Sequence, residues 1–247
     1  MKNEIQSACD TVMILAAGKG ERLQPLTNFV PKPLVHVGGK ALIEYHFENL
    51  VSAGLKRIVV NHSYLGEQIV AWTEQIADKY RTIEIILSEE KPNPLETAGG
   101  IQQALPLIDR DFFLVVNADI WTDFPYTSLI RQTLNEREAR LLLINTPEYK
   151  EQHDFYIASD GSLQNEDSKD AKGYTFSGIS FLSAKLFERL PSGKQTLAPL
   201  LRYAINAGQA EAITYNEAWY DIGTPVRLKA LRKKLNQQLI EQAGLQH

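Results

Sequence analysis

Short apolar runs and segments of helical periodicity alternate through the first 145 residues of the chain. The apolar runs predict buried strands at 11–15, 57–61, 83–87, 112–116 and 141–144. Apolar residues spaced three and four positions apart predict helices at 41–53, 65–78, 100–105 and 126–137. Strands separated by helices indicate a parallel sheet that is covered on both faces. We therefore predict an α/β, Rossmann-like fold with a mixed, mostly parallel sheet flanked by helices.

After residue 145 the strands become shorter and the connections more polar. The patterns predict strands at 154–159, 175–182, 211–215 and 218–221, and helices at 197–207 and 225–243. The polar segment 159–172 is expected to be a hairpin or a mobile loop. No linker rich in Gly, Ser or Pro divides the sequence, which predicts one domain over 1–247, with halves at about 11–145 and about 146–230. The basic residues of the last helix are expected to form a solvated face: Arg227, Lys229, Arg232, Lys233 and Lys234.

Charge and cysteine content exclude several classes of protein. Acidic residues (30) outnumber basic ones (26), giving a net charge of −4, which argues against a general nucleic-acid binder. The single cysteine, Cys9, permits neither an internal disulfide nor a Cys-rich metal cluster. The polar stretch 1–10 has no signal-peptide core, and no apolar run approaches the ~20 residues that span a bilayer. We expect a cytoplasmic protein, a monomer or weak homo-oligomer, without nucleic-acid or membrane partners.

A Gly-rich loop follows the first predicted strand. Gly18 and Gly20 lack side chains, so backbone N–H groups there can approach a phosphate closely. Arg22 offers a planar fork for phosphate oxygens, and Lys32, between two prolines, offers a compact charge on a stiff backbone. The loop is not a dinucleotide-binding motif, because Leu23 stands in place of the third glycine. From these residues alone, a phosphate site and an ordinary tight turn are both open.

Two aspartates follow predicted strands later in the chain. Asp119 comes after the most apolar strand, and Asp221 opens the segment D-I-G-T. A single aspartate at the end of a strand often caps the next helix. Two at one sheet edge can instead bind Mg²⁺, which prefers one or two carboxylates together with substrate phosphates and water. The residues by themselves leave both interpretations open.

A longer pattern extends these observations. The segments L-A-A-G-K-G-E-R-L-Q-P-L-T and P-K-P-L-V, within 15–35, closely resemble the sugar-1-phosphate nucleotidylyltransferase family. T-F-S-G-I at 175–179 and D-I-G-T-P at 221–225 continue the resemblance. It implies transfer of a nucleotidyl group to a sugar 1-phosphate with release of pyrophosphate. Because a phosphate monoester is already ionised near pH 7, this reaction requires no general base, and none is evident.

The resemblance also assigns roles to residues. It implies that Arg22, Lys32 and Asp119 are catalytic and that Asp119 and Asp221 bind Mg²⁺. The half at 11–145 would bind the nucleotide and the half at 146–230 the sugar. Candidate nucleotide-binding residues are Gly18, Gly20, Glu21, Arg22, Lys32, Glu90, Thr97 and Gly99. The region 89–100 would hold the base, although Thr97 could instead be a helix N-cap.

Within the family, several stretches are most similar to members that use UTP and N-acetylmuramic acid 1-phosphate in cell-wall sugar recycling. These are V-N-H-S-Y-L-G at 60–66, P-L-E-T-A-G-G-I at 94–101 and N-A-D-I-W-T-D at 117–123. Guanylyl, cytidylyl or thymidylyl transfer is the alternative, and a catalytically inactive relative is a more distant one. Candidate sugar contacts, each of which could instead be a turn residue, are Asn117, Asn145, Asp154 and Gly178.

The chain departs from the family pattern in two places. Many members carry an E-K-P segment whose lysine contacts the sugar phosphate, whereas residues 164–169 read Q-N-E-D-S-K. The group that grips the sugar phosphate is therefore unassigned. Ala118 replaces a glycine that precedes the metal-binding aspartate in many members. Since alanine is also small, we expect metal binding to be retained.

Overall fold

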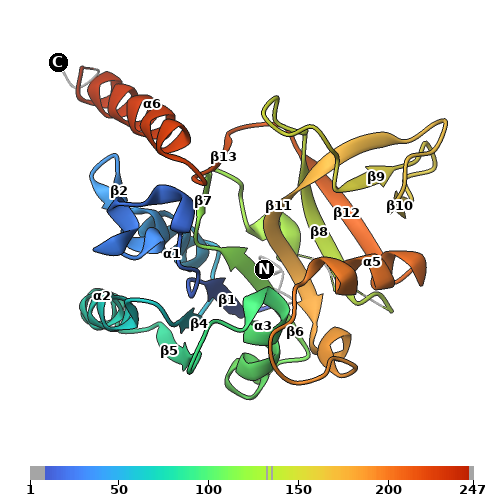
Figure 1. The fold of residues 1–247 in the computed structure, drawn as a ribbon, viewed down its shortest axis with the longest axis horizontal. Coiled ribbons are helices and arrows are strands. Elements are labelled where there is room, and N and C mark those ends of the chain that lie inside the picture. The colour runs from blue at the N-terminus through green and yellow to red at the C-terminus, as the bar shows by residue number, and fades with distance from the viewer. Residues whose placement is uncertain (1–8, 132, 135, 245–247) are drawn as a thin grey trace, which may run out of the picture.

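One mixed sheet carries the chain, with helices against both of its faces (Figure 1). This structure is a computed structural model that describes residues 9–131, 133–134 and 136–244. Four parallel strands in the spatial order β5-β4-β1-β6 form its first half. Their bounds are β1 Thr11–Leu15, β4 Arg57–His62, β5 Glu84–Glu89 and β6 Phe112–Asn117. The predicted α/β fold with a mostly parallel, helix-flanked sheet is confirmed.

Alternate residues of each strand enter two separate cores. Val12 and Ile14 of β1 face one core, and Met13 between them faces the other. Helices α1 (Leu42–Ser52) and α2 (Gly66–Lys79) pack on the first face, through side chains such as Phe47. Helices α3 (Glu96–Ile108) and α5 (Ala198–Asn206) pack on the second. Because both faces are covered, the strands read as continuous apolar runs.

The antiparallel strand β11 (Lys172–Ser183) joins the two halves of the sheet. It lies between β6 and β8 (Ala139–Ile144) and runs against both, while β12 (Ala210–Tyr215) is parallel to β8. The register between β11 and β8 shifts between Phe176 and Ser180. The first residues of β11 pair with β9 (Phe155–Ile157), which pairs in turn with β10 (Leu163–Gln164). Of the two structures expected for 159–172, a hairpin or a mobile loop, the chain therefore forms the hairpin.

The C-terminal helix α6 (Pro225–Gly244) closes a third core over the loop that follows β1. Leu228, Leu231 and Leu235 pack with Leu23 and Val35. Beside this core lie two small antiparallel ribbons, β2 (His36–Val37) with β3 (Lys40–Ala41), and β7 (Ile120–Thr122) with β13 (Trp219–Asp221). In Figure 1, α6 extends away from the sheet beyond β2. No described helix is long and apolar enough to cross a membrane.

Two helix predictions are wrong in extent. The helix expected at 100–105 is α3, which begins at Glu96. The helix expected at 126–137 is shortened to α4, Thr127–Ile130. Its continuation is prevented because the buried Arg140 guanidinium donates to the carbonyls of Leu129 (2.8 Å) and Thr133 (3.2 Å), which a longer helix would use itself. Residues 132 and 135 of that prediction, and 1–8 of the polar N-terminal stretch, lie outside the described residues.

Candidate active site

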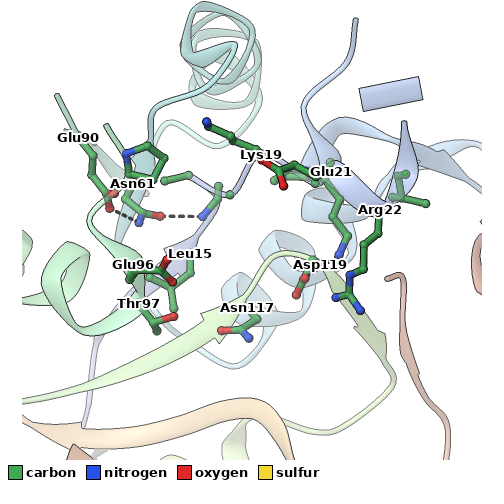
Figure 2. A pocket seen from close by; sticks show the side chains of 18 of the residues that line it. Leu15, Lys19, Glu21, Arg22, Asn61, Glu90, Glu96, Thr97, Asn117 and Asp119 are labelled. Carbon is green, nitrogen blue, oxygen red and sulfur yellow. Dashed lines mark hydrogen bonds and ion pairs between the residues drawn. The ribbon is translucent and has the colours of Figure 1, made fainter. Parts of the chain in front are cut away.

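A pocket of about 940 Å³ opens at the carboxyl ends of β1, β4 and β6 (Figure 2). The strand order reverses here: the chain runs from β1 to β4 and β5 on one side, and then crosses back to β6 on the other side of β1. Ligands bind at such switch points in open parallel sheets. In register, Leu15 of β1 stands between Asn61 and Asn117. The pocket is lined by nine of the predicted site residues: Gly18, Gly20, Glu21, Arg22, Lys32, Glu90, Thr97, Asn117 and Asp119.

A buried polar network ties three strand ends together at one end of the pocket. Asn61 Oδ1 accepts from the backbone N–H of Ala16 (2.6 Å), and Asn61 Nδ2 donates to Glu90 Oε1 (2.6 Å). The other oxygen of Glu90 accepts from the Leu95 N–H (2.7 Å). Both oxygens of Glu90, a residue only 2% exposed, are therefore engaged within the wall. Glu90 shapes the end of the pocket, and Asn61 is a lining residue that was not among the predicted site residues.

The Gly-rich loop is held close to Lys32. Gly20 has a positive φ of 64°, and a Cβ there would lie 3.1 Å from Lys32 Cβ. Thr27 Oγ1 donates to the Gly20 carbonyl at 2.9 Å, which fixes the turn. A Cβ on Gly18 would meet no atom within 4 Å, so this part of the backbone faces open space. The loop can thus present its backbone to an anion, as the sequence predicts.

Lys32 and Asp119 meet as an ion pair inside the pocket. Lys32 Nζ lies 2.6 Å from Asp119 Oδ2; the lysine side chain is 8% exposed and that of the aspartate 40%. The pair comes from distant segments, the short 3-10 turn Lys32–Leu34 and the residue before β7. Arg22 also lines the pocket, and Figure 2 shows its side chain on the same side of the pocket as Asp119 in this view. Two cationic side chains and one carboxylate therefore contribute to the lining away from Asn61.

The second predicted metal ligand, Asp221, lies on the neighbouring strand. Asp221 is paired with Ile120 in the β7–β13 register, and the Ile222 N–H donates to the Asp119 carbonyl at 3.0 Å. Asp221 itself accepts from Arg227 Nη1 (2.6 Å). A pair of carboxylates, one just before β7 and one on β13, is a ligand set that Mg²⁺ can complete with phosphates and water. The described residues form no cluster of three or more His, Cys, Asp or Glu that could hold a metal by itself.

Of the predicted sugar contacts, Asn117 lines the pocket and Gly178 packs directly beneath it. Gly178 has a φ of 84°, and a Cβ there would lie 2.8 Å from Asn117 Nδ2. Asn145 and Asp154 stand outside the pocket lining, at the two ends of the β8–β9 connection. Asp154 Oδ2 accepts from the Phe176 N–H at 2.9 Å and is paired with Lys150. This carboxylate ties the β8–β9 connection to β11.

The far side of the pocket is made by the start of α3 and by the segment 193–195. Gln195 O accepts from the N–H groups of Ala98 (2.9 Å) and Gly99 (3.1 Å). A Cβ on Gly99 would lie 2.1 Å from the Gly193 carbonyl, so glycine is required for this approach. Thr97 is not the N-cap of α3, a position taken by Leu95. Lys194 also lines the pocket and pairs with Glu96 at 3.3 Å, a contact that sequence reasoning missed.

His46 of α1 supports the strand next to Asp119. Its two ring nitrogens contact the Tyr126 hydroxyl and the Ile120 carbonyl, each at 2.7 Å. The Ile120 contact requires a donating Nε2–H, so Nδ1 accepts from Tyr126 in the neutral ring. Burial lowers the pKa of His46 from 6.5 to about 4, more than its contact with Ile120 raises it. His46 is therefore neutral across the physiological range.

This pKa predicts how stability responds to acid. Because the folded-state pKa lies below the unfolded value, the contribution of neutral His46 is fully present above pH 6.5 and is lost as the pH falls toward 4. Between pH 6.5 and 4.5 the free energy of unfolding should fall about 2 kcal/mol more in the wild type than in His46→Gln. Urea unfolding at several pH values measures this difference, and parallel curves for the two proteins would contradict it.

Comparison with known proteins gives consistent matches. A family model described as nucleotidyl transferase matches residues 11–238. The N-acetylmuramate alpha-1-phosphate uridylyltransferase of Neisseria meningitidis is 39% identical over 222 residues, 88% of this chain and 94% of that protein. The enzyme of the same name from Caulobacter vibrioides is 29% identical, over 90% and 96%. Mannose-1-phosphate guanylyltransferase catalytic subunit beta of Drosophila pseudoobscura is also 29% identical, over 94% of this chain and 66% of its own length.

Solved structures share the architecture. The crystal structure of HddC from Yersinia pseudotuberculosis superposes with a TM-score of 0.73 at 26% identity, covering 91% of this chain and 98% of that one. An inositol-1-phosphate CTP transferase from T. maritima gives a TM-score of 0.74 at 20% identity, over 93% and 97%. The second likeness concerns the fold alone.

Proposed function

The chain belongs to the nucleotidyl transferase family, and on that basis we propose that it transfers the uridylyl group of UTP to N-acetyl-α-D-muramic acid 1-phosphate. The products would be UDP-N-acetylmuramic acid and pyrophosphate, formed in the cytoplasm during cell-wall sugar recycling. The chain is a sugar-1-phosphate nucleotidyltransferase, and the 39% identity to the Neisseria uridylyltransferase, over 94% of its length, is the observation that favours these two substrates.

The charges of the pocket suit the chemistry. An oxygen of the sugar phosphate attacks the α-phosphorus of the nucleotide; the new P–O bond forms as the bond to the bridging oxygen of pyrophosphate breaks. Nucleophile and leaving group are both anionic, so the protein must align them and neutralise charge. Lys32 and Arg22, which both line the pocket, supply positive charge where the phosphates meet. The open backbone at Gly18 supplies N–H donors beside them.

The two ends of the pocket suggest where each substrate lies. The Asn61 end, with Thr97 and the start of α3, would receive the base, and the Gly-rich loop would receive the triphosphate. The sugar would lie against Asn117, whose amide rests on Gly178. In Figure 2, Asn117 lies between the Thr97 side and the Asp119 side, which is the position required for a bond joining nucleotide to sugar phosphate.

Asp119 and Asp221 would hold Mg²⁺ when it is bound. The ion supplies charge neutralisation to the phosphates during transfer. Without the ion, each carboxylate is paired with a cationic side chain of the protein, Lys32 for Asp119 and Arg227 for Asp221. These pairs hold both carboxylates in place. Transfer of another nucleotide is the second candidate, favoured by the similarity to a guanylyltransferase.

Substrate specificity gives the first prediction. Pyrophosphate release should be fastest with UTP and N-acetylmuramic acid 1-phosphate, and at least tenfold slower when CTP, GTP or dTTP replaces UTP. N-acetylglucosamine 1-phosphate and glucose 1-phosphate replace the sugar substrate in parallel assays. Preferred turnover with a different pair would keep the reaction class and overturn the proposed substrates.

Removal of the pocket lysine gives the second prediction. Lys32→Met should lower kcat/KM by about 10²–10³-fold, because a buried cation aimed at the reacting phosphates is lost. Lys40→Met is the matched control, since Lys40 pairs with Glu48 on an exposed surface and should leave the rate within twofold. Steady-state kinetics, with circular dichroism to verify folding, decides the outcome. A Lys32→Met enzyme of near wild-type rate would remove this residue from the mechanism.

Metal dependence gives the third prediction. EDTA should abolish turnover and added Mg²⁺ should restore it, because the divalent cation held by the two carboxylates would neutralise charge on the triphosphate. Asp119→Asn should raise the Mg²⁺ concentration needed for half-maximal rate by at least tenfold. Titration of activity with Mg²⁺ measures both effects. Full activity in EDTA would contradict the metal assignment.

A further inference from the structure

Arg227, which pairs with Asp221, also lies beside the lining of the pocket. It lies in the first turn of α6, and its side chain is 19% exposed. A Cβ built on Gly223, which lines the pocket, would lie 2.4 Å from Arg227 Nη2. The missing side chain at 223 therefore leaves room for this nitrogen at the wall. The expectation of a solvated basic helix face is wrong for Arg227.

The guanidinium has donors beyond those its neighbours use. Nη1 donates to Asp221 Oδ2 at 2.6 Å, and Nε faces Thr224 Oγ1 at 3.3 Å. A guanidinium carries five N–H donors in a fixed plane, so two partners do not saturate it. Nη2 lies beside Gly223, which is a residue of the pocket lining. The geometry thus has capacity for a second anion next to Asp221.

Tyr149 fixes the plane of this guanidinium from the sugar-binding half. The Arg227 guanidinium carbon lies 4.4 Å from the centre of the Tyr149 ring. Tyr149 belongs to the β8–β9 connection, the same segment that carries the sugar candidates Asn145 and Asp154. Tyr149 is 55% exposed, and both its ring and its hydroxyl interact with Arg227, which fixes the orientation of the guanidinium. The stack therefore holds the Arg227 guanidinium in a fixed orientation between α6 and the β8–β9 connection.

The proposed sugar differs from N-acetylglucosamine by an ether-linked lactyl group that ends in a carboxylate. That carboxylate would enter a site which already contains Asp119 and Asp221, so it needs a cation of its own. A planar guanidinium is the side chain best matched to a carboxylate. We propose that Arg227, oriented by Tyr149, binds the lactyl carboxylate and makes the enzyme selective for the sugar acid. This inference rests on the proposed function.

The test compares two sugars that differ in the lactyl group alone. In Arg227→Met, kcat/KM for N-acetylmuramic acid 1-phosphate should fall about 10- to 100-fold, as expected for the loss of a charge-assisted hydrogen bond. For N-acetylglucosamine 1-phosphate the fall should be at least fivefold smaller, because there the substitution removes only the partner of Asp221. Tyr149→Leu should shift the same ratio in the same direction by about three- to tenfold. Arg232→Met is the control, because Arg232 lies on the same helix and donates to the His36 carbonyl instead.

A binding measurement without turnover separates selectivity from catalysis. In metal-free buffer, calorimetry should show that Arg227→Met weakens the binding of UDP-N-acetylmuramic acid at least tenfold. The affinity for UDP-N-acetylglucosamine should stay within threefold of the wild-type value. Equal losses for both sugars would overturn the proposal and leave Arg227 as a support for Asp221. If Arg227→Met does not fold, the half-exposed Tyr149→Leu decides alone, and an unchanged ratio there overturns the proposal. A wild type that rejects N-acetylmuramic acid 1-phosphate contradicts the proposed function instead.

Discussion

The Asn61 side chain is the interaction on which the pocket depends. Its amide joins the backbone that leaves β1 to the Glu90 carboxylate beyond β5, and Glu90 in turn holds the N–H of Leu95 before α3. A buried carboxylate is tolerated because its oxygens are hydrogen-bonded. Gly100 must lack a side chain, since a Cβ there would lie 2.2 Å from Glu90 Oε1. This series of buried hydrogen bonds therefore sets the positions of the Gly-rich loop and of the Asn61 end of the pocket.

The opposite end of the pocket is organised by charge. Asp119 and Asp221 arise on the paired strands β7 and β13, and each is matched by a cation from elsewhere in the chain. Trp219 of β13 also donates to the Ser177 carbonyl at 2.9 Å, beside the irregular part of β11 where Gly178 supports Asn117. Polar groups from both halves of the sheet are thus held before a substrate arrives. Such preorganisation is what charge stabilisation in catalysis requires.

Local patterns predicted the strands and the Gly-rich loop, because apolar runs and strand-end positions are local features, whereas the roles of Lys32 and Asp119 came from the family resemblance. Contacts between distant segments could not be predicted from local patterns. The helix after residue 126 ends early because Arg140, ten residues later, takes its carbonyls. Gly99 lets segment 193–195 lie close to α3. No spacing in the sequence indicates this contact. The sequence pattern groups Arg227 with the other basic residues of the last helix. Only the fold shows its contacts with Tyr149 and Asp221.

The packing of α6 has a consequence for the order in which the protein matures. The Gly-rich loop lies near the beginning of the chain, yet Leu23 and Val35 complete their core with Leu228, Leu231 and Leu235 of α6. During synthesis, the parallel strands are available long before this helix exists. The loop therefore obtains its final support from a segment that is translated much later, and a nascent chain that still lacks α6 holds an incompletely supported Gly-rich loop.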